Sequence, residues 1–283
     1  MEEVIENPDR IEIEVTDVTN VIKPFKFTKD TSKSSLTILN QSIENIDIHE
    51  IWNNTTLHIC ADGGANRLYE YGGDKRSEFI PDFIVGDLDS ITDEVKDYYK
   101  KQGTKIIPQL SQYASDFMKS MSLILLYFNG VEIVDVDEYD GLSKLMNQLN
   151  DKHLVNINSY ILNGLGGRFD QSIHSINQIH ILNQQYPTLK NVFINEQDIV
   201  FMIPKGRNLI GYNSISDFYK GNKFPVIGLL PFSPCIISSW GLKWDVRNWK
   251  SSMNGKVSSS NGIVSTNGVI IECDEDLVVN IER

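Results

Sequence analysis

The sequence has little cysteine. Its 283 residues include three, Cys60, Cys235 and Cys273, which lie far apart and form no C-x-x-C pair. A disulfide framework or a cysteine-based zinc site is therefore not indicated. We expect all three to be reduced residues of a core or a strand.

A membrane-spanning run is also missing. No apolar stretch approaches the length that crosses a bilayer, and residues 1–6 lack the basic and apolar regions of a secretory signal. The sequence therefore predicts a cytoplasmic protein without a membrane partner.

Basic residues are outnumbered, with 26 lysines and arginines against 38 acidic residues and a formal net charge of -12. Nucleic acid is not an expected partner, because a phosphate backbone needs a basic surface. An acidic protein can still bind a nucleotide where a metal ion and a few cations screen the phosphates. The chain is otherwise of ordinary globular composition, with 41% hydrophobic residues to build a core.

Two nucleotide-binding signatures are absent as well. No G-x-x-x-x-G-K-[ST] occurs, which excludes an ordinary P-loop, and Phe169 stands where a dinucleotide fingerprint needs its last glycine. The strand, glycine turn and helix around residues 159–179 can instead carry Arg168 to a phosphate, with Asp170 just behind it.

What the sequence does have is a short apolar run that ends in Gly86, Asp87, Leu88 and Asp89. A buried strand that runs into a loop would deliver both carboxylates to the carboxyl edge of a sheet, where open α/β folds bind ligands. That arrangement suits Mg²⁺, which prefers carboxylate oxygens and substrate phosphates. A solvated turn is the alternative, since aspartate and glycine favour turns for local reasons.

A second glycine turn follows the predicted strand 56–61. Asp62, Gly63 and Gly64 would let the backbone turn tightly towards a ligand, and Asn66 lies in a segment that can begin a helix. An ordinary strand-to-helix turn is equally compatible with these residues.

Ser115 is predicted to cap a helix that carries Phe117, Met121 and Leu125 inward. Asp116 then complements the helix dipole, or it acts as a third metal-directed carboxylate with Lys119 one turn later on the same face. The acidic stretch 135–141 is not a calcium loop, because Tyr139 occupies a ligand position and the glycine comes late. We interpret residues 135–152 as a surface insertion without a catalytic effect.

The order of the predicted elements gives the fold class. Strands and helices alternate over residues 36–204, which predicts an α/β nucleotide- and metal-binding domain with a mostly parallel sheet. Short β-rich runs follow over 205–283 and predict an all-β sandwich domain. Residues 1–35 are expected to be loose or peripheral. Asn267-Gly268 between β-forming residues predicts a type I′ hairpin.

Six motifs in this order resemble the thiamine pyrophosphokinases of the eukaryotic type. The resemblance runs from about residue 36 to the end, and the motifs occupy residues 62–67, 86–90, 112–119, 166–171, 241–245 and 258–261. It implies a homodimer with active sites between subunits. It also implies transfer of the pyrophosphoryl group of ATP to the hydroxyl of thiamine, with Mg²⁺ as the cofactor and AMP as the second product.

The resemblance assigns roles to the motif residues. The carboxylates implied to be catalytic and metal-directed are Asp87, Asp89 and Asp116. The implied nucleotide or phosphate contacts are Asp62, Gly63, Gly64, Asn66, Lys119 and Arg168. The implied thiamine contacts are Gln112, Ser115, Asp170, Trp244, Ser260 and Asn261.

Physical chemistry agrees with the assignment of Trp244. Thiamine carries a fixed positive charge, so a tryptophan face offers stacking and cation–π attraction, although a tryptophan in a β-rich segment can also be sandwich core. Trp240 replaces the small polar residue expected before Gly241, and Ser115 stands where the family often has threonine.

Two other functions fit parts of the sequence. A metal-dependent glycosyltransferase also holds a sugar nucleotide with an Asp-x-Asp pair, but it explains neither residues 112–119 nor the Trp244 segment. A catalytically silent thiamine- or nucleotide-binding regulator is the third hypothesis, and the presence of all three carboxylates argues against it.

Overall fold

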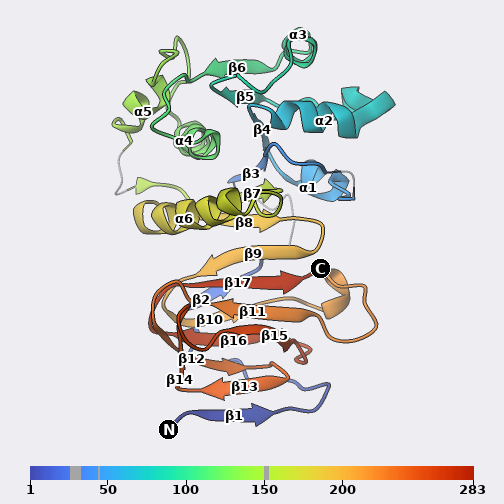
Figure 1. The fold of residues 1–283 in the computed structure, drawn as a ribbon, viewed down its shortest axis with the longest axis vertical. Coiled ribbons are helices and arrows are strands. Elements are labelled where there is room, and N and C mark those ends of the chain that lie inside the picture. The colour runs from blue at the N-terminus through green and yellow to red at the C-terminus, as the bar shows by residue number, and fades with distance from the viewer. Residues whose placement is uncertain (26–32, 44, 150–152) are drawn as a thin grey trace. The chain divides into compact units, whose positions relative to one another are not determined.

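The computed structural model describes residues 1–25, 33–43, 45–149 and 153–283. The chain forms two compact units (Figure 1). We call Phe27–Glu196 the α/β unit and Met1–Lys26 with Gln197–Arg283 the β unit. Residues 26–32 and 150–152, which belong to the predicted loose start and the predicted insertion, lie outside the described residues.

A parallel sheet forms the centre of the α/β unit, with its strands in the order β6-β5-β4-β3-β7-β8. The strands are short apolar runs because helices cover both faces of such a sheet, and all of β5 is buried. Their bounds are β3 Lys33–Ile38, β4 Leu57–Ala61, β5 Phe83–Gly86, β6 Lys105–Pro108, β7 Ile157–Leu162 and β8 Leu189–Ile194.

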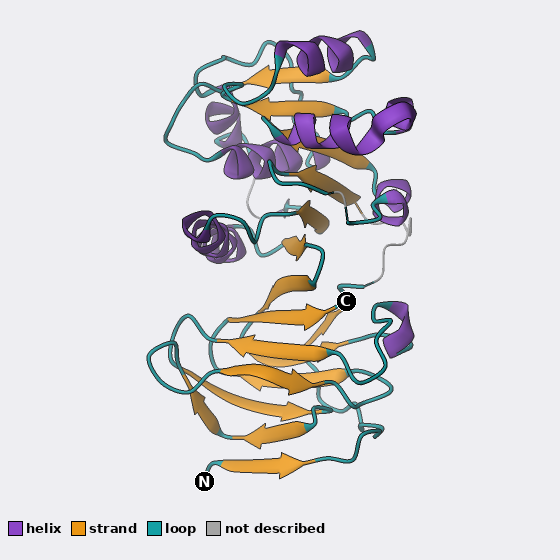
Figure 2. Cartoon of the chain, turned by 45° about the vertical axis from the view of Figure 1, so that its right-hand side comes forward, coloured by secondary structure: helices purple, strands orange, loops and turns teal. Residues whose placement is uncertain are grey.

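The helices α1, α2 and α3 lie on one side of this sheet, and α4, α5 and α6 lie on the other (Figures 1 and 2). Right-handed crossovers produce the division, because the chain steps outward from β3 to β6 and then returns to β7 on the far side of β3. Ligands of open α/β sheets bind at the carboxyl ends of strands near such a reversal. The helix bounds are α1 His49–Asn54, α2 Gly64–Gly72, α3 Asp93–Lys101, α4 Asp116–Phe128, α5 Gly141–Met146 and α6 Phe169–Gln185, with the 3₁₀-helix η1 over Gly73–Glu78.

Helix α4 begins as the sequence predicts. The Ser115 hydroxyl accepts the Met118 N–H at 3.3 Å, and Phe117, Met121 and Leu125 are all buried. The helix packs against β3, β4 and β5. Its first residue, Asp116, therefore lies at the carboxyl end of the sheet.

The β unit is a sandwich. One layer has the strand order β15-β11-β17-β9, and the other has the order β14-β12-β16-β10-β2, in which β2 is Asn20–Ile22. The fold class predicted from the sequence, an α/β domain with a mostly parallel sheet followed by a β-sandwich, is confirmed. The strand bounds are β9 Asp198–Ile203, β10 Gly206–Ile210, β11 Val226–Leu230, β12 Cys235–Trp240, β13 Trp244–Arg247, β14 Trp249–Ser251, β15 Ser258–Gly262, β16 Val269–Cys273 and β17 Leu277–Glu282, with the 3₁₀-helix η3 over Ile215–Asp217.

The N-terminal segment, predicted to be loose or peripheral, contains two strands at the edges of sheets. Strand β1, Glu3–Glu6, pairs antiparallel with β13, and β2, Asn20–Ile22, pairs parallel with β10. Both segments bind to strand edges whose backbone groups would otherwise lack partners. Residues 1–26 thus group with 197–283. Strand β9 pairs with β17 and joins the same unit, so the limits differ from the predicted ranges 1–35, 36–204 and 205–283.

The hairpin prediction at Asn267-Gly268 is wrong. Strand β15 pairs with β11, whereas β16 pairs with β10 and β12, so the strands on either side of this dipeptide belong to different layers. The Asn267 side chain instead accepts the Ile13 N–H at 3.0 Å and donates to the Ile13 carbonyl at 2.8 Å. It therefore anchors the N-terminal segment.

The cysteines agree with the expectation from composition. Cys60, Cys235 and Cys273 are free and buried, as predicted. Among the described residues, no helix has both the length and the apolar character needed to cross a membrane.

Candidate functional site

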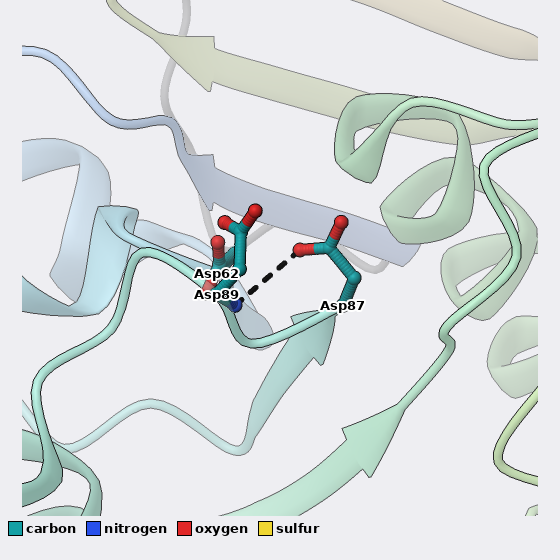
Figure 3. A group of neighbouring side chains, drawn as sticks. All are labelled: Asp62, Asp87 and Asp89. Atoms are coloured by element: carbon teal, nitrogen blue, oxygen red, sulfur yellow. Dashed lines mark hydrogen bonds between the residues drawn. The ribbon is translucent and has the colours of Figure 1, made fainter.

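Three carboxylates meet at the carboxyl edge of the α/β unit. Asp62 directly follows β4, and Asp87 and Asp89 follow the neighbouring strand β5. One oxygen of each side chain lies within 4.8 Å of one oxygen of each of the others (Figure 3). Aspartate oxygens in this arrangement are the ligands that Mg²⁺ prefers, so these residues fit a magnesium ion.

Asp62 shapes the loop that carries the other two carboxylates. Its backbone N–H donates to the Val85 carbonyl at 2.9 Å, and its two carboxylate oxygens accept the N–H groups of Ser90 and Ile91, each at 3.1 Å. The side chain is buried, and this burial raises the pKa of Asp62, with a further contribution from the charge of Asp116. Asp62 is thus both a member of the cluster and the anchor of its loop.

Two glycines allow this close packing. A Cβ atom on Gly86 would lie 2.7 Å from the Asp62 Cβ and 3.1 Å from the Asp116 Cγ, and one on Gly64 would lie 2.1 Å from the Ile38 carbonyl oxygen. Either substitution would force the backbone or the carboxylates apart. A Cβ atom on Gly63, which precedes α2, would likewise lie too close to the Asn40 side chain.

Asp116 lies beside the cluster and is not one of its three members. It forms an ion pair with Lys119, with 2.9 Å between Oδ1 and Nζ, and Lys119 is only 5% exposed. Burial raises the pKa of Asp116 more than the ion pair lowers it. The predicted metal-directed set of Asp87, Asp89 and Asp116 therefore differs from the set of carboxylates that the structure brings closest together, in which Asp62 takes the third place.

Gln112 contacts the cluster directly. Its Nε2 donates to the Asp87 Oδ2 at 2.7 Å. Burial acts to raise the pKa of Asp87, but the hydrogen bonds from Gln112 and from the Asp89 N–H, together with the charge of Lys119, lower it overall. Asp87 is therefore held as a carboxylate, the form that binds a cation.

Other predicted contacts have partners within the protein. Asn66 donates to the Ser90 carbonyl at 2.9 Å and accepts the Thr92 N–H at 3.1 Å, so its amide fastens the loop after β5 to α2. The Ser115 hydroxyl, besides capping α4, donates to Gln178 of α6 at 3.2 Å. Both residues therefore hold the site's elements together.

Arg168 and Asp170 are paired with each other at the start of α6. The closest nitrogen and oxygen are 2.6 Å apart, and the side chains are 75% and 62% exposed. Neither belongs to the carboxylate cluster. Because the pair is solvated, Arg168 can exchange Asp170 for a phosphate at little cost.

In the β unit, Trp244 on β13 is 41% exposed, so it is not core. Buried Asn261 accepts the Trp244 N–H at 3.0 Å and donates to the Trp244 carbonyl at 2.7 Å, while Ser260 is exposed. Asn261 thus holds the backbone of Trp244 in place. The unexpected Trp240 lies between Arg207 and Arg247, whose guanidinium carbons are 4.0 and 4.3 Å from its ring centre.

Sequence reasoning missed Asp245. This buried carboxylate accepts hydrogen bonds from the Ser239 hydroxyl at 2.9 Å, from the Gly241 and Leu242 N–H groups at 3.1 Å, and from the Asn7 amide at 2.6 Å. It fixes the turn that leads into Trp244. Its place next to Trp244 in the motif 241–245 was the available signal.

Known proteins resemble both units. A family model described as "Thiamin pyrophosphokinase, catalytic domain" matches residues 48–190, and one described as "Thiamin pyrophosphokinase, vitamin B1 binding domain" matches residues 216–278. The thiamine pyrophosphokinase of Saccharomyces cerevisiae is 35% identical over 99% of this chain and 96% of its own length.

Solved structures agree. A thiamin pyrophosphokinase from Candida albicans has a TM-score of 0.93 and 46% identity, covering 100% of this chain and 98% of its own. The yeast thiamin pyrophosphokinase structure has a TM-score of 0.89 and 34% identity, with coverages of 99% and 96%.

Proposed function

The chain belongs to the thiamine pyrophosphokinase family, and we propose that Asp62, Asp87 and Asp89 form the metal-binding end of its active site. The enzyme transfers the pyrophosphoryl group of ATP to the hydroxyl of thiamine, giving thiamine diphosphate and AMP. The convergence of these three carboxylates at the carboxyl edge of a parallel sheet is the observation that carries the proposal.

A bound magnesium ion would neutralise phosphate charge in this reaction, and Asp62, Asp87 and Asp89 would hold it. Gln112 orients Asp87 through their 2.7 Å hydrogen bond. Arg168, exposed at the start of α6, is the proposed second cation for the phosphates, with Lys119 beside Asp116 as a third. Catalysis of this kind depends on positioning and charge neutralisation more than on covalent chemistry.

The transfer itself forms one bond and breaks another. The thiamine hydroxyl oxygen attacks the β-phosphorus in line, the bond from that phosphorus to the bridging oxygen of AMP breaks, and the hydroxyl loses its proton. Asp116 is our candidate to accept this proton, because it lies beside the carboxylate cluster, against Gly86, and burial raises the pKa of its carboxyl group.

Trp244 is the proposed platform for thiamine. Its partly exposed ring, held by Asn261, can attract the thiazolium charge. We propose as well that the enzyme is cytoplasmic, and that it is a homodimer with active sites between subunits, as the family resemblance implies. Light scattering should then give about twice the 32.2 kDa mass of one chain.

A turnover assay tests the reaction. Purified protein with ATP, Mg²⁺ and thiamine should release AMP and thiamine diphosphate, and it should release neither when thiamine is left out or EDTA is added. Release of ADP, or no nucleotide product, would contradict the proposal. The glycosyltransferase alternative has no support, because both units match models of one pyrophosphokinase family.

A further inference from the structure

The acidic insertion, expected to be a surface excursion, is hydrogen-bonded to the strip of chain that follows β6. The N–H groups of Leu110 and Ser111 donate to the carbonyls of Glu138 and Tyr139 at 2.7 and 2.8 Å. Gln112, which contacts Asp87, is the next residue of that strip. The insertion is therefore connected to the carboxylate cluster through two residues of backbone.

Gln109 makes this connection rigid. It is 2% exposed, and both ends of its amide reach the insertion, because Nε2 donates to the Asp137 carbonyl at 2.8 Å and Oε1 accepts the Leu142 N–H at 2.9 Å. Its backbone N–H donates to the Gly86 carbonyl at 2.7 Å, directly before Asp87. A single residue thus ties the insertion, the strip and the end of β5 together.

We propose that Gln109 is a positioning residue, which clamps residues 137–142 of the insertion to the strip 109–112 so that Gln112 meets Asp87. The inference rests on the proposed role of Asp87 in holding the metal ion. Gln109 fixes one end of the strip and Gln112 contacts the carboxylate at the other. Release of the clamp would let the amide of Gln112 move relative to a carboxylate that must be placed to within fractions of an ångström.

The insertion and Gln109 also line a small cavity next to α4. The cavity has a volume of about 110 Å³, and its lining includes Lys119 of α4 together with Tyr139 and Leu142 of the insertion. Tyr139 and Leu142 of the insertion therefore face the same cavity as Lys119, which pairs with Asp116. Loss of the clamp would therefore act on the contact between Gln112 and Asp87.

The first test compares two variants that each lose buried side-chain hydrogen bonds. Gln109→Met keeps the length of the side chain and removes its amide. Thr104→Val removes the 2.8 Å hydrogen bond from the Thr104 hydroxyl to the Pro81 carbonyl. Thr104 directly precedes β6, so it lies at the amino end of the strand that Gln109 follows. We expect Gln109→Met to lower kcat about tenfold or more and to raise the Mg²⁺ concentration for half-maximal rate several-fold, since small displacements near the reacting groups are costly. Thr104→Val should leave both within about twofold.

A double-mutant cycle asks whether Gln109 acts through Gln112. In a Gln112→Ala background, adding Gln109→Met should lower kcat by less than about twofold, because the contact that it positions is already gone. If the effects of Gln109→Met and Gln112→Ala on kcat multiply in the double variant, the proposal is overturned. An unchanged Mg²⁺ dependence in Gln109→Met would also overturn it.

Amide hydrogen exchange supplies a readout that needs no turnover. The N–H groups of Leu110, Ser111 and Leu142 should exchange at least about tenfold faster in Gln109→Met than in the wild type or in Thr104→Val, since they lose the clamp. Unchanged exchange would overturn the clamp. Wild-type protein that releases no AMP would overturn the proposed function instead, and the exchange result would stand apart from it.

Discussion

Asp62 in the α/β unit and Asp245 in the β unit are both buried carboxylates that hold a loop. Asp62 accepts two backbone N–H groups and fixes the loop that carries Asp87 and Asp89. Asp245 accepts two backbone N–H groups and fixes the turn that leads into Trp244. The same local device therefore supports the two proposed substrate-binding regions.

Their surroundings differ. Asp245 also accepts from the Ser239 hydroxyl and the Asn7 amide, so its charge is compensated by four donors. Asp62 accepts hydrogen bonds from the loop that follows β5, at Ser90 and Ile91, and stands beside the carboxylates of Asp87 and Asp89. A carboxylate surrounded by donors stabilises the fold, whereas one placed among carboxylates has its charge best compensated by a cation.

The largest effect should come from removing the charge of Asp62. Asp62→Asn should lower turnover by about 10³-fold, because an amide is a poor ligand in place of a charged one. Mg²⁺ should also cease to raise the thermal midpoint of the protein, a linkage effect that the wild type should show. Asp97→Asn, an equal charge change at an exposed position of α3, is the matched control. Retention of the Mg²⁺-dependent midpoint in Asp62→Asn would remove Asp62 from the metal site.

Asp245→Asn should act mainly on stability. The substitution replaces a carboxylate oxygen, which accepts hydrogen bonds, with an NH₂ group that faces other donors. We therefore expect a loss of about 3 kcal/mol in the free energy of unfolding. Urea denaturation measures it. Asp9→Asn, which removes an exposed partner of Lys243, should cost less than about 0.5 kcal/mol. Equal stability of the two variants would show that the four donors to Asp245 contribute no more to stability than the exposed ion pair of Asp9 does.

Trp244→Ala should raise the KM for thiamine about tenfold and leave the KM for ATP unchanged, since a cation–π contact contributes roughly 1 kcal/mol or more. Initial rates at varied thiamine concentration measure this. Trp240→Phe is the control, because Trp240 contacts Arg207 and Arg247 and has no proposed ligand. An unchanged KM in Trp244→Ala would end the proposed role of Trp244.

The smallest effect concerns the amino edge of the parallel sheet, which has no proposed ligand. His58 stacks on Trp52 with ring centres 3.9 Å apart, and burial lowers the pKa of His58 below its unfolded value. The unfolded chain then binds the proton more readily, so stability is full above about pH 6.5 and falls as the pH drops through that value. His58→Phe should flatten the slope of stability between pH 7.5 and 5.5, and exposed His153→Gln should not. Identical slopes in all three proteins would exclude the effect.

Local patterns predicted much of the molecule. The alternation of apolar runs and glycine turns gave the α/β unit, and Ser115 marked the start of α4. The apolar run before Gly86 indicates the Asp87 and Asp89 pair, and the motif 112–119 indicates Gln112. The 2.7 Å hydrogen bond between Gln112 and Asp87, however, depends on which strands are neighbours in the sheet.

Other features of the fold and of the site depend on pairing between residues that are far apart in the sequence. The segment 1–26 had no signal of its own, because β1 and β2 gain partners only at edges formed by residues more than 180 positions away. Gln109 carries no signal in the sequence, since its amide bonds to carbonyl and N–H groups about 30 residues further on.

The sequence by itself determined the order of strands and helices, the glycine turns and the aspartates that follow them, because these depend on periodicity and local backbone freedom. Only the tertiary structure decided that β4 and β5 lie side by side. That neighbour relation brings Asp62 to Asp87 and Asp89, whereas Asp116 pairs with Lys119 at the start of α4. Convergence of charges is a property of sheet order, and sheet order is set by long-range packing that no local pattern encodes.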